Sequence, residues 1–226
     1  MVGSVFSKDG KERFLLTSSY RLVVVNDMGP ADIIEFWIGD ASWDVIAAKQ
    51  RSKFWYRRDI KVDRYIKDKF GSTMLLAASN ELGDWENTGE GALALVILFD
   101  QFSRNCYRAS ARAYANDAKA LQVAKRAIKV GLHRSLSVVG RAFLHHPFHH
   151  SETLTEQNRY VELTLELSQL APPEWREFAM GFVDYAKDHH KVITRFGRFP
   201  HRNRVLNRKS TPEEQEYLKR SSRYGQ

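Results

Sequence analysis

The chain has 226 residues, with 35 Lys and Arg against 27 Asp and Glu, and 43% of its residues are hydrophobic. This composition excludes the disordered and fibrous classes and is typical of a compact globular protein. No stretch rich in Pro, Gly or Ser divides the chain. We therefore expect a single helical domain over residues 31–226, preceded by an N-terminal extension over residues 1–30.

The net charge of +8 is distributed in blocks. Residues 104–141 hold 9 basic and 1 acidic side chains, and residues 191–226 hold 10 and 3. Residues 70–103 and 142–190, in contrast, each carry a net charge of −5. We therefore expect basic and acidic helices to face one another. A nucleic-acid-binding surface would not need the acidic blocks, so the pattern disfavours nucleic acid as a partner.

Cysteine content and hydropathy bear on the compartment. The single cysteine, Cys106, cannot form an internal disulfide. The longest apolar run, residues 92–99, is far shorter than the roughly 20 residues that span a bilayer. We expect a cytoplasmic protein without a membrane-spanning segment, and a homo-oligomer is left open. No cofactor is expected.

The first predicted elements differ in type. Apolar runs at residues 14–16 and 22–25 indicate short strands or an ordered arm, so the extension is expected to be irregular or β-like. From about residue 30 onward the spacing of apolar residues is helical. Pro30 is placed to begin the first helix and Gly39 to end it.

Start and stop signals mark the later helices. Thr88 precedes a stretch over residues 92–99 that is apolar nearly all round, which predicts a central helix. The other signals are an N-cap at Asp117, an N-cap at Ser151, a helix end near Gly197 and a capping box over residues 211–214. Together these signals predict an all-α fold, a helical bundle.

Six stretches resemble those of a known family: FWIG at 36–39, WENT at 85–88, LFDQFSRN at 98–105, RAYAND at 112–117, PFHHSE at 147–152 and RFGRFPHRN at 195–203. They are similar to the bacterial family catalogued as domain of unknown function 924, and the likeness runs from about residue 31 to 218. It implies a helical superhelix of tetratricopeptide-repeat-like type with a concave side. It implies no established activity.

The chain departs from the family pattern at several positions. Ala109 stands where the family usually has Gly. His145, His146 and His149 stand where the family usually has aromatic or aliphatic residues, whereas His150 matches the family pattern.

Asp100 and Arg104 lie four residues apart at the end of the apolar helix, so we expect an acid–base pair on one helix face. Polar groups at such a place must be hydrogen-bonded or line a cavity. One interpretation is a network of interhelical hydrogen bonds. The other is a pocket in which Asp100, with His150 and Glu152, is catalytic and Arg104 and Asn105 bind a ligand.

The stretch over residues 195–203 interleaves three arginines and a histidine with two phenylalanines, which helical patterning does not require. Guanidinium groups bind carboxylate or phosphate through two hydrogen bonds. This pattern predicts a ligand-binding loop whose contributing residues are Arg195, Arg198, His201, Arg202 and Asn203. The alternative is that these arginines bridge to acidic helix residues such as Glu162, Glu166 or Asp188.

The histidines over residues 145–150 suggest a metal site at first sight. Pro147 interrupts the stretch and disfavours a helical conformation at His146, so the histidines need not share one helix face. We expect adventitious surface histidines and no metal site.

Two functions remain. The preferred one is a polar, arginine-rich pocket that binds an anionic small molecule and acts on it by acid–base chemistry. The alternative is an interaction module of tetratricopeptide-like type that holds a peptide or its C-terminal carboxylate without catalysis. Whether the protein is an enzyme is left open by the sequence.

Overall fold

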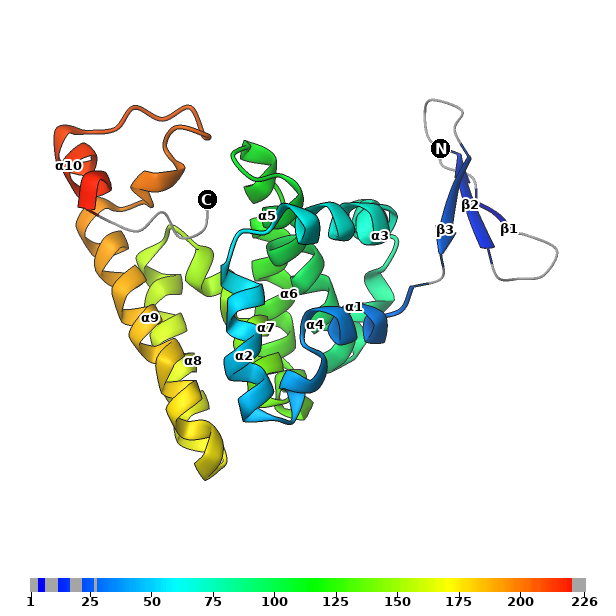
Figure 1. Ribbon diagram of the computed structural model, residues 1–226, viewed down its shortest axis with the longest axis horizontal. Helices are drawn as coiled ribbons and strands as arrows, with labels where there is room; N and C mark the ends of the chain where they lie inside the picture. The colour runs from blue at the N-terminus through cyan, green and yellow to red at the C-terminus, as the bar shows by residue number, and fades with distance from the viewer. Residues whose placement is uncertain (1–3, 7–11, 17–21, 27, 221–226) are drawn as a thin grey trace.

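The computed structural model describes residues 4–6, 12–16, 22–26 and 28–220 (Figure 1). Parts of the expected extension over residues 1–30, and residues 221–226 of the expected domain, lie outside the described residues. No helix in the described part of the chain is both long enough and apolar enough to cross a membrane.

Three short strands precede the helices: β1 (Ser4–Phe6), β2 (Glu12–Leu16) and β3 (Leu22–Asn26). They form an antiparallel sheet in the order β1-β2-β3, in which Phe14 of β2 lies opposite Val5 of β1 and Val24 of β3.

Residues 28–220 are helices and their connections. The α-helices are α1 (Pro30–Trp37), α2 (Val45–Tyr56), α3 (Ile60–Ala78), α4 (Gly89–Val96), α5 (Ser103–Cys106), α6 (Asp117–Lys129), α7 (Val138–His150), α8 (Leu154–Leu170), α9 (Arg176–Phe196) and α10 (Pro212–Arg220). The shorter helical turns are η1 (Gly39–Ser42), η2 (Gly83–Asn87), η3 (Ile97–Phe102), η4 (Ala111–Tyr114), η5 (Leu132–Ser135), η6 (Pro173–Trp175) and η7 (Pro200–Arg202). The all-α prediction for this region is confirmed.

The centre of the core is α4, as its apolar sequence predicted. It packs against α1, α6 and α7, and its residues are buried except Glu90. The Thr88 hydroxyl accepts a hydrogen bond of 3.0 Å from the Gly91 N–H and so caps the helix. A Cβ atom at Gly91 would lie 2.0 Å from the Trp85 carbonyl oxygen, so only glycine fits this turn.

The apolar helix continues beyond α4 as a π-helical turn, η3. All six of its residues are buried, including Asp100 and Gln101. The wider π turn is frequently found at functional sites, because it changes the direction of side chains relative to a regular α-helix. It places two polar residues inside the core.

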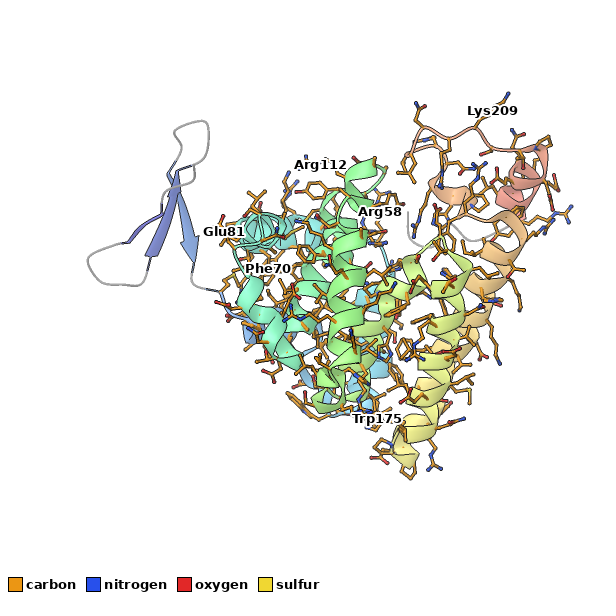
Figure 2. The ribbon with its side chains drawn as sticks, turned by 180° about the vertical axis from the view of Figure 1, so that it is seen from behind. Arg58, Phe70, Glu81, Arg112, Trp175 and Lys209 are labelled. Carbon is orange, nitrogen blue, oxygen red and sulfur yellow. The ribbon has the colours of Figure 1, made fainter. Side chains whose placement is uncertain are left out.

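Helices α8 and α9 lie side by side as an antiparallel pair (Figure 1). As predicted, α9 ends at Gly197, which has a positive φ of 67°. The chain then passes through η7 to α10, and Lys209 in this segment lies at the opposite end of the molecule from Trp175, just before α9 (Figure 2).

The predicted capping box of α10 is confirmed. The Thr211 hydroxyl accepts a bond of 3.2 Å from the Glu214 N–H, and Glu214 Oε2 accepts one of 2.7 Å from the Thr211 N–H. Two N–H groups that the first turn of a helix leaves without a helical partner are thereby satisfied.

Two N-cap predictions are wrong. Asp117 is the first residue inside α6 rather than its cap, because both of its carboxylate oxygens accept hydrogen bonds from Arg104. Ser151 ends α7, and its hydroxyl is bonded to Thr153, the residue that occupies the N-cap position of α8. In both cases a tertiary or local partner takes the side chain that the helix end would otherwise use.

The expectation that Pro147 interrupts the helix is also wrong, since α7 runs through it to His150. The proline removes only one N–H donor near the end of the helix. Every residue from Ala142 to His149 is buried, so tertiary packing holds this turn in the helical conformation.

The facing charge blocks are confirmed. Arg126 of the first basic block pairs with Glu86, and Lys125 pairs with Glu156. The second basic block is divided: Arg208 pairs with Glu152 of an acidic block, whereas Arg195 and Arg198 pair with Glu213 and Glu214 of their own block.

Ala109, an exposed residue, adopts a left-handed conformation with φ of 56°. This conformation costs an L-residue roughly 1–2 kcal/mol, and the extra chain entropy of glycine offsets about half of the gain from relieving it. Ala109→Gly is expected to raise the free energy of unfolding by about 0.5–1 kcal/mol in urea denaturation. The matched control is Ala115→Gly, at an exposed alanine with φ of −61°, which should lower stability. Equal losses in both variants would contradict the prediction.

Candidate functional site

A cavity of about 690 Å³ opens between α2, the η3–α5–η4 segment, the ends of α7 and α8, and α9 with η7. Its polar lining includes three arginines and five histidines. The lining residues are Lys49, Ser52, Trp55, Tyr56, Gln101, Arg104, Asn105, Arg108, Tyr114, His146, His149, His150, Tyr160, Glu177, Phe178, Gly181, Phe182, Tyr185, His189, Phe199, His201 and Arg202. A cavity of this size accommodates an organic molecule of metabolite size.

His150 and Asp100 form a hydrogen-bonded pair at the cavity wall. His150 Nδ1 lies 2.7 Å from Asp100 Oδ1, and the Asp100 side chain is completely buried. Because a carboxylate only accepts hydrogen bonds, this contact places the proton on Nδ1 and leaves Nε2 as an acceptor. Burial, followed by the nearby Arg104 charge, holds the pKa of His150 well below its ordinary value. The imidazole is therefore a neutral base at pH 7.

Arg104 holds this pair in place. Its Nη1 lies 2.9 Å from Asp100 Oδ1, and its two terminal nitrogens donate to the two oxygens of Asp117 at 2.9 Å each. Burial alone would lower the pKa of Arg104, but Asp100 and Asp117 outweigh it and raise that pKa. The predicted acid–base pair of Asp100 and Arg104 is thus present, with Asp117 as a third member.

Arg202 enters the cavity wall from η7 and is much less completely paired. The residue is 6% exposed, and its Nε has no hydrogen-bond partner. The carboxylate of Asp117 lies 3.7 Å from its Nη1, too far for a hydrogen bond. The rings of Phe199 and Tyr114 flank the guanidinium, with centroids 4.6 and 4.7 Å from Cζ. Burial lowers the pKa of Arg202, since it disfavours the charged form.

The histidines of α7 are not surface residues, so that expectation is wrong. His145, His146 and His149 are 2, 5 and 6% exposed, because the turn that contains Pro147 stays helical and packs inside the core. The His149 ring lies 3.8 Å from that of His189, centroid to centroid. Burial lowers the pKa of His189 to about 4 and that of His201 to about 3. The imidazoles of the cavity are therefore uncharged near pH 7.

No three His, Cys, Asp or Glu side chains within the described ranges are grouped so that they could hold a metal ion. Cys106 lies outside the cavity lining, and burial and Asp63 raise the pKa of its thiol to about 11. The thiolate needed for nucleophilic chemistry is therefore disfavoured.

Of the residues predicted from sequence, the structure brings five into one cavity and places the sixth, Asp100, directly behind His150. The five are Arg104, Asn105, His150, His201 and Arg202. Asn105 also donates a hydrogen bond of 2.8 Å to Asp63 on α3.

Glu152 does not line the cavity. Its carboxylate accepts two hydrogen bonds from Arg208, at 2.6 and 2.9 Å, and one of 2.8 Å from the Phe199 N–H. Burial opposes ionisation of Glu152, but these hydrogen bonds outweigh it and lower its pKa. Glu152 therefore fixes the loop that carries Arg202.

Arg195, Arg198 and Asn203 also lie outside the cavity lining. Arg198 donates hydrogen bonds of 2.6 and 2.9 Å to Glu214, and Asn203 donates one of 3.2 Å to the same carboxylate. Arg195 bonds Glu213. Arg195 and Arg198 therefore form bridges to acidic helix residues, which was the alternative to a ligand-binding role. Their partners, however, are on α10 rather than at Glu162, Glu166 or Asp188.

The sequence analysis did not identify several cavity residues: Tyr56, Arg108, Tyr114, Tyr160 and Tyr185. A signal existed for Tyr114, which lies inside the stretch RAYAND that the family resemblance uses. Tyr56, Tyr160 and Tyr185 sit at ordinary helical spacing and look like core residues until the helices are assembled. Arg108 lies in the turn after α5, and no sequence pattern distinguished it from the other arginines of its basic block.

Comparison with known proteins identifies the family to which the chain belongs. The model of the family described as "Bacterial protein of unknown function (DUF924)" matches residues 33–222. The chain belongs to this family. A solved structure, the protein of unknown function ATU0120 from Agrobacterium tumefaciens, is 35% identical, with a TM-score of 0.72. The match covers 85% of this chain and 97% of that one. No curated protein matches the chain.

The Arg198–Glu214 pair should make stability depend on acid pH. Hydrogen bonds from Arg198, Thr211 and Asn203 lower the pKa of Glu214 from 4.5 to about 2. A lowered pKa stabilises the fold above pH 4.5, and this contribution disappears as the pH falls toward 2. Glu214→Gln should therefore melt below wild type at pH 7, with the difference shrinking through this window.

The control is Glu213→Gln, whose carboxylate pairs, among the described residues, with the exposed side chain of Arg195. Its melting temperature should follow that of wild type at every pH. A constant deficit of Glu214→Gln between pH 7 and 2.5 would contradict the assignment.

Proposed function

We propose that this protein binds an anionic small molecule in the cavity, with Arg202 as the anchor, and acts on it by acid–base chemistry through His150 and Asp100. The observation that carries the proposal is the incomplete pairing of the buried Arg202 guanidinium. A buried cation without hydrogen bonds destabilises the folded state. A bound ligand that supplies the missing hydrogen bonds and an opposite charge would offset this cost.

The neighbouring charges support an anion at Arg202 in particular. Arg104 bonds both Asp100 and Asp117, and Arg108 donates to both oxygens of Asp63. The Arg202 fork makes no hydrogen bond to any described carboxylate. A carboxylate or phosphate that entered the cavity would satisfy it through charge-assisted bonds.

The acid–base part rests on the His150–Asp100 pair. Asp100 orients the ring and fixes the proton on Nδ1, so Nε2 can take a proton from a bound ligand or from a water beside it. Asp100 then stabilises the imidazolium that forms. In this role His150 touches the reacting group, and Asp100 acts through His150.

The alternative is a tetratricopeptide-like module that holds a peptide by its C-terminal carboxylate. It would use the same arginine, so the anion test includes a peptide with a free C-terminus and its amide. Stabilisation by the free-acid peptide alone, without a metabolite that binds, would favour the interaction module.

Arg202→Gln is expected to abolish the thermal stabilisation that acetate, benzoate or inorganic phosphate confers on wild type in a fluorimetric melt. A ligand that binds only the native state raises its melting temperature, and removing the anchor removes that rise. Without ligand, the variant should melt at or above the wild-type temperature, because an incompletely paired buried charge is lost.

Arg195→Gln, at an exposed ion pair with Glu213, is the matched control and should keep the full ligand shift. The proposal fails if a folded Arg202→Gln protein responds to anions as wild type does.

His150→Gln is expected to leave anion binding intact and to eliminate turnover of any ligand found by that screen. The control is His190→Gln, at a ring on α9 that bonds the Asn158 side chain outside the cavity. Because the pKa of His150 lies well below 6.5, the base form persists into acid solution, and the acid limb of kcat/KM should lie well below pH 6.5. A fall of kcat/KM centred at pH 6.5 or above would exclude His150 as the base.

A further inference from the structure

The cavity wall away from the arginines is aromatic. It is formed by side chains of α2, α8 and the N-terminal half of α9, namely Trp55, Tyr56, Tyr160, Phe178, Phe182 and Tyr185. Burial raises the pKa of Tyr160, so its hydroxyl carries no charge near neutral pH. This wall offers mainly ring surfaces, and the two charged side chains that line the cavity beside it, Lys49 and Glu177, are paired with each other at 2.7 Å.

A row of rings joins this aromatic wall to Arg202. The guanidinium lies over Phe199, whose centroid is 5.5 Å from that of His189. His189 is followed by Tyr185 at 5.8 Å, and Tyr185 stacks with Tyr56 of α2 at 6.2 Å. All of these residues line the cavity. A molecule bound to Arg202 therefore has an uncharged aromatic path along which the rest of it can lie.

The charges around Arg202 fit a single negative charge. The Asp117 carboxylate, 3.7 Å from Arg202, repels a second one. His201 and His189 are neutral neighbours, and Arg104 is occupied by Asp100 and Asp117. A monocarboxylate matches this environment better than a phosphate dianion.

Gly181 marks open space on the aromatic side. It lies inside α9, three residues after Phe178, and lines the cavity. Apart from its two chain neighbours and the nearby backbone of α9, a Cβ atom built on Gly181 would meet no heavy atom within 4 Å. A larger side chain at this position can therefore occupy the cavity without displacing its neighbours.

We propose that the ligand is an amphipathic monocarboxylic acid. Its carboxylate binds Arg202, and its aromatic or aliphatic body lies along the ring path toward Gly181 and the α2–α9 side of the cavity. This inference rests on the proposed function, since it names the class of ligand that the Arg202 site takes.

The experiment measures binding of 6-phenylhexanoate, its neutral amide, benzoate and inorganic phosphate by isothermal titration calorimetry. The wild-type chain is compared with Gly181→Leu and Arg202→Gln. The matched control is Gly71→Leu, at a helical glycine of α3 that also has no atom within 4 Å of its Cβ position but lies outside the cavity.

The wild type should bind 6-phenylhexanoate at least about tenfold more tightly than benzoate, because five additional methylenes leave water. The amide should bind at least about tenfold more weakly than the acid, since it lacks the charge that pairs with the guanidinium. Gly181→Leu should weaken 6-phenylhexanoate at least about tenfold and leave benzoate unchanged, because only the longer body reaches the filled space. Gly71→Leu should match wild type, and Arg202→Gln should lose both acids.

Two outcomes overturn the inference while the proposed function stands. One is equal affinity for the short and the long acid, with no effect of Gly181→Leu and loss of both in Arg202→Gln. The other is binding of phosphate through Arg202 without binding of either carboxylate. If the amide binds as tightly as the acid and Arg202→Gln has no effect, the anion site itself is wrong and the proposed function fails.

Discussion

The ion pairing of Arg104 with Asp100 and Asp117 is the interaction on which the rest of the site depends. It joins the end of the central apolar helix to the start of α6, and it places the charges of Asp100 and Arg104 in the interior, bonded to the half-buried Asp117. Breaking one member of such a buried network leaves the others unpaired, which is strongly destabilising. The same network fixes the carboxylate that orients His150, and it occupies Asp117 so that Arg202 is left with a distant partner.

Burial determines the chemistry of the cavity more than the identity of its residues does. Five histidines and three arginines line it, yet the imidazoles whose titration is shifted are shifted toward the neutral form. The positive charge that remains incompletely compensated is concentrated on Arg202. A polar, histidine-rich wall of this kind offers hydrogen bonds and proton acceptors without adding charge, and this combination suits selection of a singly charged, partly apolar ligand.

Several residues that resemble binding groups in the sequence serve to hold Arg202 in position. Arg208 bonds Glu152, Glu152 bonds the Phe199 N–H, and Phe199 lies beside the Arg202 guanidinium. Farther from the cavity, the Glu214 carboxylate accepts hydrogen bonds from Arg198 and Asn203. The loop that follows α9 is thus anchored at both ends, so the guanidinium keeps a defined orientation although it makes no hydrogen bond at Nε.

The sequence by itself determined the features that depend on local chemistry. Helical spacing, the caps at Thr88 and Thr211, the end of α9 at Gly197 and the Asp100–Arg104 pair all follow from residues within a few positions of one another. Tertiary structure alone decided which groups meet. Arg198 and Arg202 are both arginines of one short loop, but Arg198 forms an ion pair with Glu214, whereas Arg202 lines the cavity. Pro147 and Asp117 show the same limit, because long-range packing and pairing outweigh the local preference of a side chain.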